Sequence, residues 1–330
     1  MRRESPVAKP HLHDQPENAP LRESLATLST EQVSDRHPDL DILSTADLVR
    51  AMNEEDAAVA AAVDCSGPAI AATIDGIVSR MSTGGRLIYV GAGTAGRMGI
   101  LDASEAPPTF GTSREQVIGV IAGGPGAIHA AVENAEDDAD AGAADLRALA
   151  VSAADAVIGI SASGRTPYVL GAVKYASSVG AFTAGLSCNA PSDLGRACDV
   201  AIDVVVGPEI LTGSTRLKAG TAQKMVLNML STITMVRLGK TYRNLMVDMQ
   251  ATNEKLRARA ERTVMLATHA SAVDAARALH AVDGSVKAAI LMLLTDLEPG
   301  AAIQVLAEHR GFLNEAIGAA LTNEGSAGVR

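Results

Sequence analysis

The fold is decided by the stretch RLIYVGAGTAGRMGILDASEAPPTF, residues 86–110. Its short apolar run predicts a buried strand. A helix start follows, after a turn that contains Gly91, Gly93, Gly96 and Gly99. Glycines let the backbone approach a ligand closely, and free N–H groups at a helix start attract an anion. The stretch therefore predicts an anion site between strand and helix, with a proline-marked turn over residues 102–108.

The same order of strand, turn and helix recurs along the chain. Short apolar runs, each followed by a turn and a helical stretch, cover residues 87–90, 117–121, 156–160, 181–186 and 200–206. Continuous apolar runs of this length suit strands that are covered on both faces. The sequence therefore predicts an α/β fold with a parallel sheet flanked by helices.

Helical periodicity accounts for most of the remaining chain. Residues 44–63 and 69–81 predict helices before the sheet. Residues 219–238 predict a long helix, apolar on most of its circumference, which is expected in the core or at a subunit interface. Residues 242–265 predict a charged connecting helix, and the end of the chain predicts three short helices with Ser271 and Ser285 as N-caps.

Three segments of different character are expected. Residues 1–26 are polar and rich in proline, which is typical of a disordered tail. Residues 27–262 are expected to hold the sheet and its helices, and residues 263–330 a small helical module.

Composition and charge exclude several classes of partner. The net charge of −10 argues against nucleic acid or an anionic membrane as the main partner. The cysteines, Cys65, Cys188 and Cys198, are far apart and predict buried free thiols in a reducing compartment. The chain has no apolar run of membrane-spanning length and no secretory signal pattern, so a soluble cytoplasmic protein is expected.

The spacing Gly91-x-Gly93-x-x-Gly96 also matches the dinucleotide-binding fingerprint. Such a site needs an acidic residue near the end of the second strand to hold the ribose hydroxyls. Here the nearest acid, Glu115, precedes that strand. The sequence therefore disfavours a nicotinamide cofactor.

Hydroxyl-bearing turns point to a phosphate ligand instead. Ser161, Ser163 and Thr166 follow the third strand, where side-chain hydroxyls and free N–H groups can saturate phosphate oxygens. The polar segment 212–218, which includes Lys218, follows the last strand. Ligands bind at the carboxyl ends of strands in open α/β sheets, so we expect one crevice for a small phosphorylated polyol or sugar.

Carboxylates are the candidates for catalysis. No histidine lies in these turns and no Cys/His ligand spacing occurs, so neither a Ser-His-Asp set nor a metal site is predicted. Glu105 comes just before Pro107-Pro108. Glu136 is spaced by four from Val132 and Ile128, which on a helix would place it beside an apolar stripe. Each is a candidate general acid or base.

Long motifs reveal a family resemblance from about residue 29 to 315. They are GAGTAGR at 91–97, LDASEAPP at 101–108, SASGRTPY at 161–168 and GSTRLKAGTAQK at 213–224, together with matches over 244–256. The chain resembles the N-acetylmuramic acid 6-phosphate etherases, which are built on the sugar isomerase (SIS) phosphosugar-binding domain, a flavodoxin-like sandwich. Its C-terminal helices resemble the small UBA-like module of these enzymes.

The resemblance implies an activity and roles for particular residues. It implies cleavage of the lactyl ether of N-acetylmuramic acid 6-phosphate in cell-wall sugar recycling, by a homodimer without cofactor or metal. Glu105 falls on the family's general acid and Glu136 on its second catalytic glutamate, the C2 base. Hydroxyl loops of SIS domains hold the sugar phosphate, so the implied substrate-binding residues are Gly93, Thr94, Ser161, Ser163, Thr166 and Lys218.

Two departures and two alternatives accompany this resemblance. Ala95 stands where many members have Ser, and the Thr30-Glu31 pair lacks the Arg-Asn that usually follows it. A sugar-phosphate aldose–ketose isomerase would use the same fold and a carboxylate base but would release no lactate. A phosphosugar-sensing regulator like the glucokinase regulatory protein would need two tandem SIS domains, whereas these motifs occur once here.

Overall fold

The computed structural model describes residues 27–249 and 254–327, with side chains as far as residue 322. The predicted disordered tail, residues 1–26, lies outside the described residues. A five-stranded parallel sheet has the order β2-β1-β3-β4-β5, the flavodoxin-like order. The strands are β1 (Leu87–Gly91), β2 (Val117–Ile121), β3 (Ala156–Ile160), β4 (Phe182–Ser187) and β5 (Val200–Asp203). The predicted α/β fold is confirmed.

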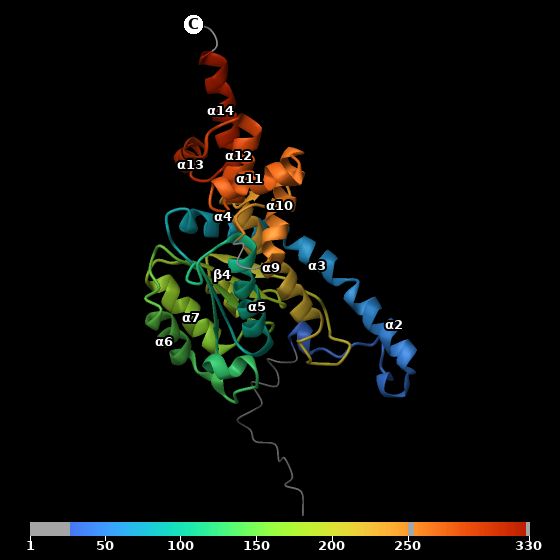
Figure 1. The fold of residues 1–330 in the computed structure, drawn as a ribbon. Coiled ribbons are helices and arrows are strands. Elements are labelled where there is room, and N and C mark those ends of the chain that lie inside the picture. The colour runs from blue at the N-terminus through green and yellow to red at the C-terminus, as the bar shows by residue number, and fades with distance from the viewer. Residues whose placement is uncertain (1–26, 250–253, 328–330) are drawn as a thin grey trace, which may run out of the picture.

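Helices cover both faces of the sheet (Figure 1). Successive strand residues point to opposite faces, so Tyr89 belongs to one core cluster and Ile88 to another. The Tyr89 cluster packs against α4 (Gly67–Met81), α5 (Gly93–Phe110) and α9 (Lys218–Arg237). The Ile88 cluster packs against α6 (Ala139–Ala148), α7 (Pro167–Ser178) and α8 (Asp193–Arg196).

In the described residues before α4, from residue 27 on, the chain forms two short 3₁₀ turns and two helices. The turns are η2 (Ser29–Glu31) and η3 (Leu40–Ile42), and the helices are α2 (Thr45–Asp56) and α3 (Val59–Cys65). Ser44 caps α2 by accepting the N–H of Asp47 at 3.2 Å, as the sequence predicts. The single helix predicted over 44–63 is wrong, because the chain breaks at Ala57 and Ala58. In Figure 1, α2 extends away from the sheet.

The turn predicted over residues 102–108 is wrong, because α5 remains helical through these residues. Pro107 and Pro108 lie in its last turn, and Gly111, with φ of 63°, ends it. Prolines there leave the carbonyls of two preceding residues without helical donors. Burial of Ala103, Ala106 and Phe110 in the core offsets this loss, so α5 stays continuous past Glu105.

The glycine spacing brings α5 close to the sheet. A Cβ on Gly96 would lie 2.6 Å from the Ile121 side chain and 2.8 Å from the carbonyl oxygen of Gly91. A Cβ on Gly99 would lie 2.9 Å from the Cβ of Tyr89. These glycines are therefore explained by helix–strand packing, a role that requires no dinucleotide.

A buried carboxylate joins β1, α5 and α9. Asp102 on α5 accepts the hydroxyl of Tyr89 at 2.9 Å, the amide of Asn228 at 2.8 Å and the hydroxyl of Ser231 at 3.1 Å. Burial raises the pKa of Asp102, and its hydrogen bonds oppose that shift. Because the three donors come from a strand and a second helix, this carboxylate fixes how the elements pack.

The C-terminal part differs from prediction in two places. The charged helix predicted over 242–265 is α10 (Glu254–Thr268), and a hairpin of β6 (Thr241–Tyr242) and β7 (Leu245–Met246) precedes it, where Arg243 has a φ of 53°. Between residues 269 and 327 the structure has four helices after α10 instead of three, and Gly311, with φ of 80°, separates the last two. They are α11 (Ala272–Ala281), α12 (Val286–Thr295), α13 (Pro299–Glu308) and α14 (Leu313–Ala327).

These helices share a hydrophobic cluster of their own. Val264, Ala278, Ile290 and Leu313 belong to it, and Ser271 and Ser285 cap α11 and α12 as predicted. The predicted segment boundary at 262/263 falls inside α10, whose Ala260 and Val264 both join this cluster. The division into segments stays a prediction.

Two of the three free cysteines are shielded from solvent. Cys188 is buried and Cys198 half-buried, and burial raises the pKa of both thiols to about 12. Cys65 is exposed on α3, so the prediction that all three are buried is wrong. Among the described residues, no single helix is long and apolar enough to cross a membrane. Two pairs of consecutive helices reach that length and composition only if the two helices of each bent pair are counted as one segment.

Asp102→Ala should lower the free energy of unfolding by roughly 2–4 kcal/mol, because it leaves two buried hydroxyls, those of Tyr89 and Ser231, and the half-buried amide of Asn228 without their acceptor. Urea denaturation followed by circular dichroism measures this loss. Ser104→Ala, an exposed change on the same helix, is the matched control and should leave the stability within about 0.5 kcal/mol of the original. Equal stability of the two variants would show that the network does not hold the elements together.

Candidate active site

A cavity of about 430 Å³ opens at the carboxyl edge of the sheet. It lies where the strand order reverses, between β1 and β3. The chain leaves β1 into α5 on one face and leaves β3 toward α7 on the other, so the two connections separate and a crevice forms. Residues 92–95, 161–163 and 165–167 line it, so the first two predicted turns converge on one cavity.

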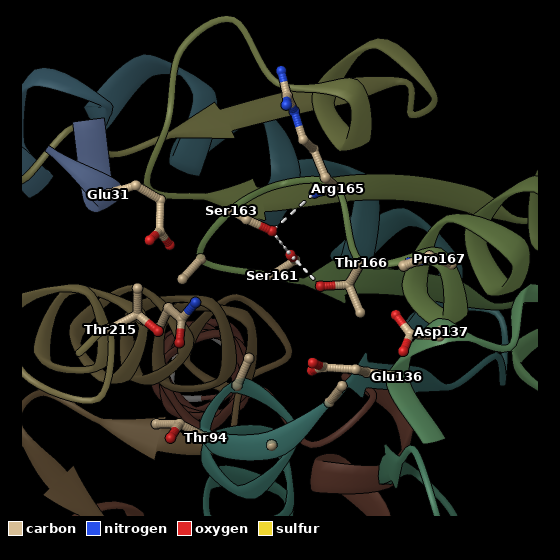
Figure 2. A pocket seen from close by; sticks show the side chains of 15 residues that line it. Glu31, Thr94, Glu136, Asp137, Ser161, Ser163, Arg165, Thr166, Pro167 and Thr215 are labelled. Carbon is tan, nitrogen blue, oxygen red and sulfur yellow. Dashed lines mark hydrogen bonds between the residues drawn. The ribbon is translucent and has the colours of Figure 1, made fainter. Parts of the chain in front are cut away.

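The loop after β3 is preorganised by its own hydroxyls (Figure 2). The Ser161 hydroxyl lies 2.7 Å from that of Thr166 and 3.3 Å from that of Ser163. The N–H of Gly164 donates to Ser161 and that of Arg165 to Ser163, and Gly164 has φ of 69°. The first turn of α7 begins directly after Thr166. Hydroxyls and free helix N–H groups together can surround a phosphate.

The loop after β1 supplies the opposite wall. Gly93, with φ of 52°, and Thr94 begin α5 and line the cavity. A Cβ on Gly220 of α9 would lie 3.5 Å from the Thr94 methyl, so the starts of the two helices are neighbours. The structure therefore brings five of the six predicted substrate-binding residues, Gly93, Thr94, Ser161, Ser163 and Thr166, into one pocket.

Lys218, the sixth, does not reach the pocket. Its side chain is buried and its ammonium lies 2.5 Å from the Glu55 carboxylate of α2. Its backbone N–H donates to Glu209 at 2.9 Å. A buried ammonium needs a paired charge, and Glu55 supplies it, so Lys218 ties α2 to α9 in this structure.

Glu136 lies in the pocket, although the predicted local structure is wrong. No continuous helix joins Ile128 to Glu136, because Gly124–Ile128 and Ala135–Asp137 form two separate 3₁₀ turns, and Asn134 between them has φ of 61°. The side chain of Glu136 is exposed and lines the cavity opposite the hydroxyl loop (Figure 2).

Glu105 lies outside the pocket. It is exposed on α5, twelve residues after Gly93, and at 1.5 Å per residue the helix carries its Cα about 18 Å from the pocket end. Leu101 and Pro108, on the same side of α5, are also exposed. One protomer alone therefore does not bring Glu105 and Glu136 together.

Five polar residues that the sequence did not single out also line the cavity: Asp137, which is next to Glu136, Arg165 of the loop after β3, and Glu31, Thr215 and Gln223. Glu31 comes from η2, Thr215 from the loop before α9, and Gln223 from α9. Thr215 lies in the hydroxyl-bearing segment 212–218, and Glu31 in the Thr30-Glu31 pair shared with the family, so signals for both existed. No sequence pattern around Gln223 indicated a binding residue, since only the packing of α9 brings its side chain to the cavity.

The chain is similar to several known proteins. Models of the glucokinase regulatory protein N-terminal SIS domain and of the SIS domain match residues 69–177 and 128–233. N-acetylmuramic acid 6-phosphate etherase of Streptomyces coelicolor is 59% identical over 306 residues, 93% of this chain and 98% of that one. The etherase of Pectobacterium atrosepticum is 54% identical, covering 89% and 97% of the two chains. A phosphoheptose isomerase from Francisella tularensis is 18% identical with a TM-score of 0.46, covering 59% of this chain and 100% of that one.

Ser163→Ala should weaken the binding of inorganic phosphate about tenfold, because one hydroxyl of the loop is lost, which corresponds to ~1.4 kcal/mol. Isothermal titration calorimetry with phosphate measures it. Ser178→Ala, at the far end of α7, is the control and should bind like the original. Unchanged phosphate affinity in Ser163→Ala would show that the anion lies elsewhere.

Proposed function

The chain belongs to the N-acetylmuramic acid 6-phosphate etherase family, and on this premise we propose that it cleaves the lactyl ether of N-acetylmuramic acid 6-phosphate with water. The products are N-acetylglucosamine 6-phosphate and D-lactate. One observation supports this most: a hydroxyl-lined cradle for a phosphate and a carboxylate, Glu136, share one pocket. A phosphosugar held there by its phosphate would present its carbon chain to that carboxylate.

The reaction is an elimination followed by a hydration. In the open-chain aldehyde, the proton on C2 is acidic because it neighbours the carbonyl. A base removes it, the C3–O bond breaks, and lactate leaves with a proton from a general acid. Water then adds to the unsaturated aldehyde at C3. Two positioned carboxylates suffice for these transfers, and each contributes roughly 10²–10⁴-fold.

Glu136 is our candidate for the base. It lies across the cavity from the Ser161–Thr166 loop, so phosphate and base would contact opposite ends of a bound sugar (Figure 2). We place the enzyme in the cytoplasm, in recycling of cell-wall sugar. Within the chain we assign residues 27–262 to the catalytic domain and residues 263–330 to the helical module.

Glu105 is our candidate for the acid, and it reaches a pocket only if a second copy provides it. We propose a homodimer in which the surface formed by α5 and α9 is the interface. Leu101 on α5 is 49% exposed and Ile233 on α9 is 41% exposed. α9 also lines a shallow, mainly apolar hollow with Met225 and Met229. Covering such apolar surface stabilises an association, and the partner would carry Glu105 toward the neighbouring pocket.

Incubation with N-acetylmuramic acid 6-phosphate in ¹⁸O-water should release D-lactate and leave the label at C3 of the amino sugar, because water replaces the lactyl oxygen. Mass spectrometry and an enzymatic lactate assay follow both products. The Glu136→Gln variant is the negative control. Isomerised sugar without lactate would support an aldose–ketose isomerase and refute the etherase proposal.

Co-expressing Glu105→Gln with Glu136→Gln should restore activity that neither variant has alone. If Glu105 acts on the partner's pocket, each mixed dimer holds one complete site of two, so the purified mixed dimer should show about half of the original rate, and an unpurified, randomly paired mixture about a quarter. Lactate release by the doubly tagged, purified dimer measures it. Inactive mixed dimers would contradict the shared site.

A further inference from the structure

One side of the cavity holds a buried amide without a partner. Gln223 is 1% exposed and lines the cavity from α9. Among the residues that the structure describes, its Nε2 meets no hydrogen-bond acceptor. Buried N–H groups almost always have a partner, since an unpaired one is destabilising. The acceptor is therefore expected from a molecule bound in the pocket.

A fixed carboxylate lies on the same side of the cavity. Glu31 follows Thr30, which is fully buried and accepts the Nδ2–H of Asn189 at 3.0 Å. Ser29 donates its hydroxyl to Oδ1 of Asn189 at 3.0 Å. These bonds attach η2 to the loop after β4, 159 or 160 residues away in sequence, and so place the Glu31 side chain at the pocket.

Glu31 and Gln223 are joined through the loop before α9. A Cβ on Gly213 would lie 3.3 Å from Oε2 of Glu31, so this loop packs beside the carboxylate. The N–H of Gly220 donates to the carbonyl of Thr215 at 3.0 Å, which attaches the same loop to the first turn of α9. Figure 2 shows Glu31 and Thr215 on one side of the cavity and Glu136 on the other.

The charges on this side suit a neutral group. Arg165 is the one cation among the described cavity-lining residues, and it comes from the hydroxyl loop. The carboxylate of Glu31 would repel a phosphate or a lactate. It can accept a hydrogen bond from an N–H, and the Gln223 amide can donate one to a carbonyl oxygen. An amide substituent offers one of each.

We propose that Glu31 and Gln223 form the subsite for the acetamido group of the amino sugar. The carboxylate of Glu31 accepts the acetamido N–H, and Nε2 of Gln223 donates to its carbonyl oxygen. The identity of this sugar rests on the proposed function. A site that hydrogen-bonds one substituent discriminates against a ligand that lacks it, because its own buried groups then stay unpaired.

Calorimetry with two ligands tests this subsite without requiring turnover. The original protein should bind N-acetylglucosamine 6-phosphate more tightly than glucose 6-phosphate, which has a hydroxyl in place of the acetamido group. Gln223→Met and Glu31→Gln should each lose about tenfold in affinity for the N-acetyl ligand, with little change for glucose 6-phosphate. The comparison variant Ser163→Ala should lower the affinity for both ligands by the same factor.

The outcomes separate the subsite from the etherase proposal. Equal losses for both ligands, or an unchanged preference in both variants, would overturn the subsite even if lactate is released. A preference that depends on Glu31 and Gln223 in a protein that releases no lactate would leave the subsite standing and refute the etherase activity. If Gln223→Met does not fold, Glu31→Gln, a half-buried position in η2, decides the question.

Discussion

The hydrogen bonds of the Asp102 carboxylate are the constraint on which the pocket depends. Asp102 lies on α5 and receives donors from β1 and from α9, so one buried group sets the positions of three elements. Both helices begin at the cavity, where α5 contributes Gly93 and Thr94 and α9 contributes Gln223. A shift of either helix along the sheet would break this network, so the shape of the site follows from the packing of the core.

The pocket shows how an acidic protein can hold an anion. The net charge is −10, and the cavity lining carries more carboxylates than cations. The Ser161–Thr166 loop compensates locally with hydroxyls and with N–H groups at the start of α7. Such groups are fixed dipoles at close range, so they outweigh charges that lie farther away in solvent.

In the proposed mechanism, the position of Glu105 links the acid step to the pairing of two copies of the chain. α5 is helical without a break from Gly93 to Glu105, and this places Glu105 about 18 Å along the helix from the pocket that its own copy of the chain forms. Together with the exposed apolar side chains of α5 and α9, the placement supports a site that two copies complete. Under this proposal, the glycine-rich turn and Glu105, which are adjacent in sequence, serve two different pockets.

The sequence by itself determined the parallel α/β sheet and the two polar turns after β1 and β3, whereas the helical spacing that pointed to Glu136 was wrong and only the family resemblance singled it out. The sheet and the turns follow from short-range patterns, since apolar runs, glycines and hydroxyls reveal strand ends locally. Tertiary structure decided what depends on distant contacts. Burial of Ala106 and Phe110 in the core keeps α5 helical where a turn was predicted, so Glu105 lies on the helix outside the pocket. The ion pair with Glu55 on α2 keeps the Lys218 side chain out of the pocket. Asn189 placed Glu31, and the packing of α9 buried Gln223, because partners more than a hundred residues away leave no periodic signal in the chain.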